Sequence, residues 1–195
     1  MAYPARKLQP NEAYYTYADN LSWDDDDHTE IVSGIPIMFA APSPRHQEVL
    51  LELAAQLREF LRGKSCKVYP APFAVRLFQK ERDRPRNVDT VVEPDISVVC
   101  DKSKLDKSGC KGAPDFIIEI LSPSTKRHDR ERKFALYQTA GVREYWIVDP
   151  ENNTVETYVL REGGYEAESA AVRGGKIPVA VLDGCIIDLD LVFAE

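Results

Sequence analysis

Residues 112–150, GAPDFIIEILSPSTKRHDRERKFALYQTAGVREYWIVDP, hold two apolar runs separated by a helical stretch. DFIIEILS (115–122) and REYWIVD (143–149) are apolar on both faces, which is typical of central strands covered on both sides. The helix between them, from about Thr125 to Ala140, ends before a glycine, the residue favoured just after a helix. Because a helical crossover between two such strands favours parallel pairing in one sheet, this segment predicts an α/β fold.

The remaining segments predict further strands and helices around this centre. In chain order they are a short helix near 12–18, a hairpin at 30–40 that turns at Ser33-Gly34, a helix at 42–62, one bent strand or two at 67–78, a loop at 79–90, a strand at 91–100 and a C-terminal meander after Pro150. We find no internal repeat and no linker. We therefore expect a single domain over residues 1–195, with an irregular extension at 1–29, a core at about 30–160 and β additions at 161–195.

The charge distribution limits how the chain can bind nucleic acid. A net charge of −7 argues against indiscriminate binding, which depends on neutralising phosphates. Basic residues nevertheless cluster at 126–133 and at 76–86. Because most surface charge runs are solvated faces, we favour that interpretation for the second cluster, and the alternative of a local basic patch stays open.

The composition also bears on the compartment. No run of about 18 apolar residues exists, so we expect no membrane span, and the N-terminus MAYPARKLQP lacks the apolar region of a signal peptide. Cys66, Cys100, Cys110 and Cys185 form no C-x-x-C pair. We therefore expect neither a zinc site nor a disulfide framework, but reduced thiols in a cytoplasmic protein.

Two carboxylates interrupt apolar strands. Alternation places Glu119 on one face with Ile117 and Leu121, where a lone buried carboxylate would be costly. Asp95 interrupts the preceding strand just after Pro94, a residue that breaks a strand ladder. If the two strands are neighbours, the carboxylates form an oxygen-rich site suited to Mg²⁺ or Mn²⁺. The alternative for Glu119 is a solvent-facing position at the end of its strand.

A lysine lies on or beside the apolar face of the next helix. At about 100° per residue, Asp129 and Tyr137 each fall about 40° from Lys133. Taken alone, Lys133 would be a side chain that extends to solvent and pairs with Asp129. If Glu119 and Asp95 are close, the lysine and the carboxylates satisfy each other instead.

A histidine occupies the core-facing stripe of the first long helix. His46 lies in the first turn, on the same face as Leu50, Leu53 and Leu57. A histidine in this position is usually a hydrogen-bonded core residue. The alternative is that His46 contacts the reaction site, and both interpretations stay open.

Several segments together carry a resemblance to a known family. They are PSPRH (42–46), EPDISVV (93–99), GAPDFIIEILSPST (112–125), the Asp129–Lys133–Tyr137 spacing and GVREYWIVDP (141–150). Over roughly residues 30–160 the chain resembles the Uma2 family of endonuclease-like bacterial proteins, which is similar to the PD-(D/E)xK nuclease superfamily. The resemblance implies a restriction-endonuclease-like α/β core with a mixed central β-sheet flanked by helices. An N-terminal hairpin and a C-terminal β-meander would be additions to it.

The resemblance implies a metal site. Asp95 would correspond to the superfamily's aspartate and Glu119 to its second acidic residue, with the Ile120 carbonyl as a further ligand. The expected cofactor is Mg²⁺ or Mn²⁺.

The resemblance also implies catalytic and supporting residues. The superfamily's lysine stands two residues after the second acidic residue, where this chain has Leu121. In Uma2-like proteins the lysine has moved to the following helix, which makes Lys133 the candidate. His46 would be a further catalytic residue, and Asp129 and Tyr137 would support the site from behind.

These inferences predict a metal-dependent endonuclease that hydrolyses phosphodiester bonds of nucleic acid, with DNA the expected substrate. We also expect a homodimer, for which Tyr145, Trp146 and Tyr158 are candidate contact residues, although a core position is the favoured interpretation of Trp146. Two other functions stay open. One is a catalytically inactive nucleic-acid-binding or homo-oligomeric assembly protein on the same fold, and the other is a metal-dependent hydrolase of nucleotides or another phosphate ester.

Overall fold

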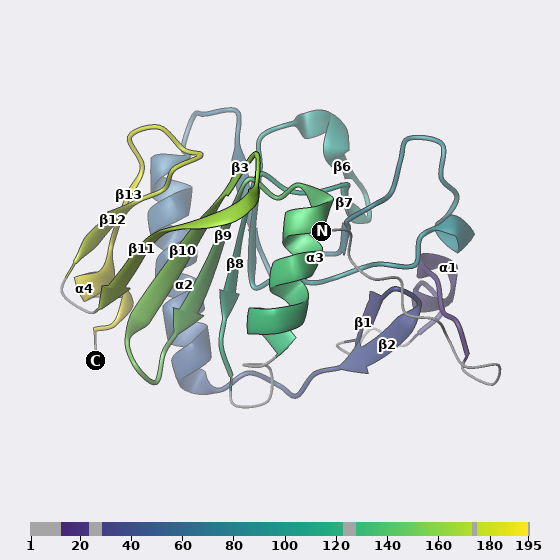
Figure 1. Ribbon diagram of the computed structural model, residues 1–195, viewed down its shortest axis with the longest axis horizontal. Helices are drawn as coiled ribbons and strands as arrows, with labels where there is room; N and C mark the ends of the chain where they lie inside the picture. The colour runs from purple at the N-terminus through teal and green to yellow at the C-terminus, as the bar shows by residue number, and fades with distance from the viewer. Residues whose placement is uncertain (1–12, 24–28, 123–127, 173–174, 195) are drawn as a thin grey trace.

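The computed structural model describes residues 13–23, 29–122, 128–172 and 175–194 (Figure 1). Its central sheet has six strands in the order β11-β10-β9-β8-β5-β3. They are β3 (Lys67–Pro70), β5 (Ile96–Val99), β8 (Phe116–Ile120), β9 (Glu144–Asp149), β10 (Thr154–Arg161) and β11 (Gly164–Val172). β8 and β9 run parallel, whereas the other neighbouring pairs run antiparallel. The predicted α/β fold with a mixed central sheet is confirmed.

The predicted helical crossover joins the two parallel strands. After β8 come a π-helical turn, η3 (His128–Lys133), and α3 (Phe134–Ala140), which ends at Gly141 in the left-handed conformation (φ 87°). In Figure 1, α3 lies in front of the sheet and α2 (Pro44–Phe60) behind it. Because both faces of β8 and β9 are covered, every residue of these two strands is buried.

Alternation along β8 divides its side chains between two hydrophobic clusters. Phe116 and Ile118 pack in the cluster beneath α2, whereas Ile117 and Leu121 pack in the cluster beneath α3. Glu119 shares the face of the second pair. The charged side chain of this strand therefore points toward α3.

α2 begins at residues that favour a helix N-terminus. The Ser43 hydroxyl accepts a hydrogen bond from the His46 amide at 3.2 Å, and Pro44 takes the first helical position. Leu53 and Leu57, one turn apart, pack onto the sheet. α2 is 17 residues long. Of the helices that the structure describes, none is long and apolar enough to cross a membrane.

β1 (Thr29–Val32) and β2 (Ile35–Met38) form the predicted hairpin. Its turn residues Ser33 (φ 52°) and Gly34 (φ 77°) both adopt the left-handed conformation. A two-residue hairpin turn of this type requires positive φ at both positions, which explains the glycine.

Several short elements surround the sheet. They are α1 (Tyr17–Asn20), β4 (Val75–Arg76), η1 (Pro85–Asn87), η2 (Lys102–Lys104), β6 (Leu105–Asp106), β7 (Gly109–Lys111), β12 (Lys176–Pro178), β13 (Ile186–Asp188) and α4 (Leu189–Val192). The meander predicted after Pro150 is correct for β10 and β11. Its last two short strands are present as β12 and β13, but they pair with each other in a separate ladder and do not extend the meander. Ile177 and Ile187 of that ladder are buried in the cluster beneath α2. Burial against this helix thus takes the place of an extension of the sheet.

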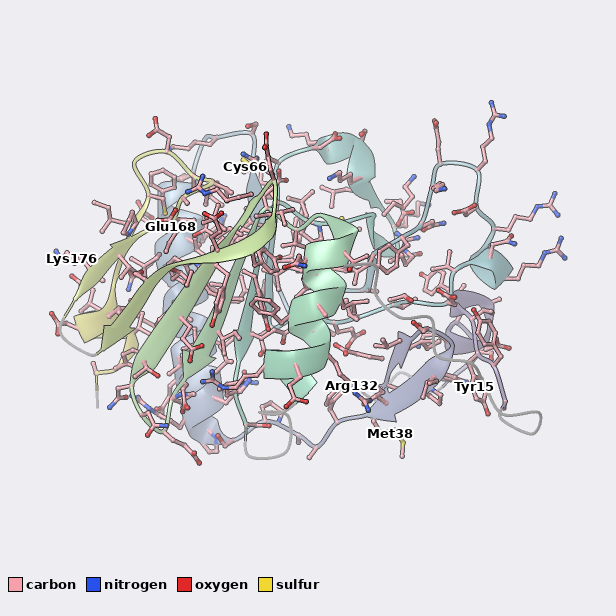
Figure 2. All side chains as sticks on the ribbon, in the orientation of Figure 1. Tyr15, Met38, Cys66, Arg132, Glu168 and Lys176 are labelled. Atoms are coloured by element: carbon pink, nitrogen blue, oxygen red, sulfur yellow. A yellow bond between two sulfur atoms is a disulfide. The ribbon has the colours of Figure 1, made fainter. Side chains whose placement is uncertain are left out.

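The expectation that all four cysteines are reduced thiols is wrong for one pair. Cys66 and Cys100 form a disulfide, at the end of the molecule opposite Met38 and Arg132 (Figure 2). The antiparallel register of β3 and β5 places these two cysteines opposite each other. Cys110 and Cys185 are free and buried, and burial raises the pKa of each thiol to about 11.

The aromatic surface predicted for a homodimer is also wrong. Tyr145 and Trp146 are fully buried, because β9 is an inner strand covered on both faces. Tyr158 is half-buried and packs its ring against that of Phe134, with 4.9 Å between the centroids. The favoured interpretation of Trp146 as a core residue is confirmed, and the homodimer stays a prediction without this surface.

Candidate active site

The sheet register brings Asp95 beside Glu119. β5 and β8 pair antiparallel with Ile96 opposite Ile118. The next position of this register places Asp95 opposite Glu119, on the face toward α3. The two carboxylates that interrupt apolar strands in the sequence therefore meet at one end of the sheet.

Ile120 presents its backbone polar groups at the same place. The ladder between β5 and β8 ends at the Ile96–Ile118 pair, so the Ile120 amide donates to the Asp95 side chain instead, at 2.7 Å from Oδ2. In a strand, the N–H and C=O of one residue leave on the same edge. The Ile120 carbonyl therefore faces the edge that carries Asp95, and the three predicted metal ligands Asp95, Glu119 and Ile120 all line one cavity.

Two side chains of the following helical segment reach Glu119. Lys133 Nζ donates to Glu119 Oε1 at 3.0 Å, and the Tyr137 hydroxyl donates to the same oxygen at 2.5 Å. Residues four apart share one face of a helix, which explains why both arrive together. Lys133 is the last residue of η3, and π-helical turns occur frequently at functional sites. Since Lys133 and Glu119 are each 3% exposed, their ion pair is buried.

Glu30 is a second buried partner of Lys133, and the sequence analysis does not predict it. Glu30 Oε1 accepts hydrogen bonds from Lys133 Nζ and from the Glu93 amide, both at 2.9 Å. Its Oε2 atom is buried and accepts no hydrogen bond from the described residues. Two backbone hydrogen bonds of 2.8 Å between Ile31 and Val91 hold β1 in this place. The sequence offers only a weak signal, a carboxylate in a hairpin strand, and such a carboxylate usually faces solvent.

His46 reaches the same site from the first turn of α2. Its Nε2 atom lies 3.3 Å from Asp95 Oδ1, and the residue is 6% exposed. The Ser43 cap described above fixes this turn. Of the two interpretations of His46, the structure favours contact with the site over a purely internal role.

These side chains line one cavity of about 380 Å³. Its charged and titratable wall consists of Glu30, His46, Glu93, Asp95, Glu119 and Lys133. Its apolar wall includes Phe39, Pro42, Leu50, Ala71 and Pro72. Four carboxylates therefore share the cavity with one lysine and one histidine. An excess of negative charge in a partly desolvated cavity favours a bound cation.

Leu121 stands at the position where the resemblance predicts a lysine, and the ammonium group beside Glu119 comes from the following helical segment instead. Leu121, at the superfamily's lysine position, is 5% exposed and packs in the cluster beneath α3. Lys133 brings an ammonium group to Glu119 from the helical side instead. The backbone of Asp129 belongs to η3, but its side chain lies outside the described part of the chain. The supporting role of Asp129 therefore stays a prediction.

The hydroxyl of Tyr137 is held in its neutral form. Burial raises the pKa of Tyr137 well above its usual value of about 10, and the nearby charges of Glu119 and Glu30 raise it further. A neutral tyrosine hydroxyl donates a hydrogen bond to a carboxylate, as it does here. The phenol thus stabilises the charged form of Glu119.

We expect Tyr137→Phe to lower the free energy of unfolding at pH 7 by about 1.5–3 kcal/mol, because Glu119 loses a hydrogen bond to a charged group. The folded pKa of Tyr137 lies above the unfolded value. Its contribution is therefore complete below about pH 10 and is lost as the pH rises above that value. Urea unfolding at pH 7 and at stepwise higher pH would measure both effects.

Tyr69→Phe is the matched control, since the Tyr69 hydroxyl makes no hydrogen bond with the described residues. We expect this variant to keep the stability of the wild type. Equal stability of the Tyr137 and Tyr69 variants at pH 7 would contradict the role given to the Tyr137 hydroxyl.

The donor set fits a divalent cation. Asp95, Glu119 and the Ile120 carbonyl offer oxygen ligands, and Glu30 Oε2 is a buried carboxylate oxygen that accepts no hydrogen bond from the described residues. Within the described ranges, no three His, Cys, Asp or Glu side chains are grouped so as to hold a metal ion by themselves. Two carboxylates, a carbonyl and water molecules would suit Mg²⁺, which usually keeps several of its waters.

Comparison with known proteins agrees with this fold. A putative nuclease belonging to DUF820 from Anabaena variabilis has a crystal structure that superposes with a TM-score of 0.71 at 19% identity, covering 92% of this chain and 97% of that one. A protein of Synechocystis, described as "Uncharacterized protein slr1290", is 24% identical over 164 residues, which are 83% of this chain and 78% of that protein.

A family model matches nearly the whole chain. It covers residues 12–190, from before α1 to within α4, and is described as "Uma2: Putative restriction endonuclease". The match includes every residue of the cavity described above. The chain therefore belongs to the Uma2 family, whose described activity is that of a nuclease.

Proposed function

We propose that this chain is a divalent-metal-dependent endonuclease that hydrolyses phosphodiester bonds of nucleic acid, with DNA as the expected substrate. The observation that carries the proposal is the buried contact of Lys133 Nζ with Glu119 Oε1, 3.0 Å, in the cavity that Asp95 also lines. Carboxylates that can hold a metal ion suit metal-assisted phosphodiester hydrolysis, and a nearby ammonium group suits the stabilisation of developing negative charge. The family assignment supports the same chemistry.

Asp95, Glu119 and the Ile120 carbonyl would hold the ion. When bound, the ion supplies Lewis-acid activation of the phosphodiester and of the attacking water. The hydrogen bond from the Ile120 amide and the contact with His46 keep the Asp95 carboxylate in one orientation. The protein thus fixes its ligands before substrate arrives, which lowers the cost of reorganisation during the reaction.

Lys133 would position the attacking water and offset the negative charge that develops on the phosphoryl oxygens. Its ammonium is held between Glu30 and Glu119 at 2.9 and 3.0 Å, so its position is determined on two sides. Phe39 adds a further contact, with its ring centroid 5.3 Å from Nζ. A lysine fixed in this way is an oriented charge rather than a mobile one.

The same ion pairs also favour an inactive alternative. Lys133 already compensates two carboxylates, so a chain without catalysis would also be stable as a binding protein. Mn²⁺ titration calorimetry separates the two functions. We expect the wild type to bind Mn²⁺ and Asp95→Asn to bind it at least about tenfold more weakly, since an amide replaces a charged ligand.

A cleavage assay with DNA, RNA and free nucleotides as separate substrates completes the test. We expect cleavage of nucleic acid with Mg²⁺ or Mn²⁺ and none with EDTA. Hydrolysis of free nucleotides, without cleavage of DNA or RNA, would instead indicate a metal-dependent hydrolase of nucleotides or another phosphate ester. If the chain neither binds Mn²⁺ nor hydrolyses any of these substrates, the remaining function is that of a binding or assembly protein.

A further inference from the structure

A long loop between β4 and β5 begins and ends at the wall of the cavity. Val75 and Val92 close its base through two backbone hydrogen bonds of 2.8 and 3.0 Å. Just outside this base, Pro72 on one side and Glu93 on the other line the cavity. In Figure 1 the segment projects at the right-hand edge of the molecule. We call residues 78–87 the basic loop.

The basic loop carries four exposed cationic side chains within seven consecutive residues. They are Lys80, Arg82, Arg84 and Arg86, and all four are exposed. None of them forms an ion pair with another residue that the structure describes. The four cations face two acidic residues in the loop, a local charge of 4 − 2 = +2, in a chain whose net charge is −7.

The loop also has internal order that would hold these cations in place. Asp83 accepts a hydrogen bond from the Lys80 amide at 2.8 Å, and its carbonyl accepts one from Gln79 Nε2 at 3.2 Å. One of the two acidic side chains is therefore used as a turn cap and does not neutralise a guanidinium. Phe78, at the start of the loop, is 42% exposed. An exposed aromatic ring beside arginines is a combination that binds unstacked bases and phosphates.

We propose that the basic loop binds the phosphate backbone of the nucleic acid on one side of the bond that lies in the cavity. The proposal rests on the proposed function for the identity of the ligand. Guanidinium groups bind phosphate oxygens through paired, charge-assisted hydrogen bonds. Because the acidic cavity itself repels the polyanion, binding requires cations outside it, and this loop provides them at the end of a stem attached to the cavity wall.

The test is a comparison of two triple variants with equal loss of charge. Arg82→Ala/Arg84→Ala/Arg86→Ala removes the arginines of the basic loop. Arg58→Ala/Lys67→Ala/Lys102→Ala removes three exposed cations from the C-terminal part of α2, the start of β3 and η2. Lys67 follows Cys66, which Figure 2 shows at the end of the molecule opposite Met38. The control variant therefore removes the same net charge as the loop variant, outside the basic loop.

Binding is measured by fluorescence anisotropy with a labelled DNA duplex in EDTA, across a series of salt concentrations. We expect the loop variant to bind at least about tenfold more weakly than the wild type at low salt. The plot of log K against log salt should become less steep, with the magnitude of its negative slope smaller by about 2–3. Each lost phosphate contact reduces that magnitude by about 0.9. The control variant should keep a slope within about 1 of the wild type. Phe78→Ala should weaken binding of a single strand about fivefold or more.

Equal affinity and slope for the loop variant and the control would overturn the proposal. So would binding of anionic lipid vesicles, but not DNA, that depends on the loop arginines. Because EDTA prevents cleavage, the result does not depend on the proposed catalysis. If the loop variant loses DNA binding and the wild type never cleaves, the loop proposal stands and the proposed nuclease activity fails. If the wild type cleaves and the loop variant binds DNA normally, the nuclease activity stands and the loop proposal fails.

Discussion

Glu119→Gln is expected to lower the rate of metal-dependent cleavage by on the order of 10²–10³-fold, with little change in fold. Glutamine keeps the shape of the side chain and an oxygen that can accept from Tyr137 at its present position. It loses the negative charge that a hard divalent cation requires. It also removes one of the two charges that hold the Lys133 ammonium.

The measurement is the initial rate of cleavage with Mg²⁺ and with Mn²⁺, together with anisotropy of DNA binding in EDTA. Glu151→Gln, at an exposed turn after β9, is the control and should cleave at the wild-type rate. DNA binding should stay within about threefold for both variants, since neither residue belongs to the basic loop. Cleavage by Glu119→Gln at the wild-type rate would show that the cavity is not the catalytic centre.

The sequence contains most of the information about this site because buried charges stand out against apolar patterns. Glu119 in a two-sided apolar strand, Asp95 after Pro94, and Lys133 on an apolar helix face each break a pattern. Breaking such a pattern costs free energy unless a partner is present, so several breaks in consecutive elements imply partners for one another. The contacts of Glu119 with Lys133, and of Asp95 with the strand of Glu119, follow this logic.

What the sequence does not contain is register between distant segments. Glu30 lies at the site because β1 bridges to Val91, about 60 residues later, through Ile31. The disulfide forms because β3 and β5 align Cys66 with Cys100 across a separation of 34 residues. Hydrophobic periodicity in a strand shows which residues face the core, but it does not show which other segment the strand pairs with. The bridge from β1 and the register of β3 with β5 therefore leave no signal in the sequence. The same reason explains why the last two strands, predicted as part of the meander, form their own ladder.

Lys133→Met is expected to abolish cleavage and also to destabilise the fold. The substitution leaves Glu30 and Glu119, each 3% exposed, without their shared cation. Removing one partner from a buried ion pair costs about 3–5 kcal/mol. Urea unfolding should therefore shift strongly to lower urea, whereas Lys102→Met, at an exposed position of η2, should unfold as the wild type does.

A second substitution separates loss of stability from loss of catalysis. Glu30→Gln combined with Lys133→Met removes one of the two uncompensated charges, so the double variant should be more stable than Lys133→Met alone, by about 1–3 kcal/mol. Its cleavage should stay absent, because neither substitution restores an ammonium group at position 133. If the double variant regains cleavage together with stability, Lys133 is only a structural counter-ion. If stability returns and cleavage does not, the ammonium itself takes part in the reaction, and the two carboxylates serve to hold it at the site.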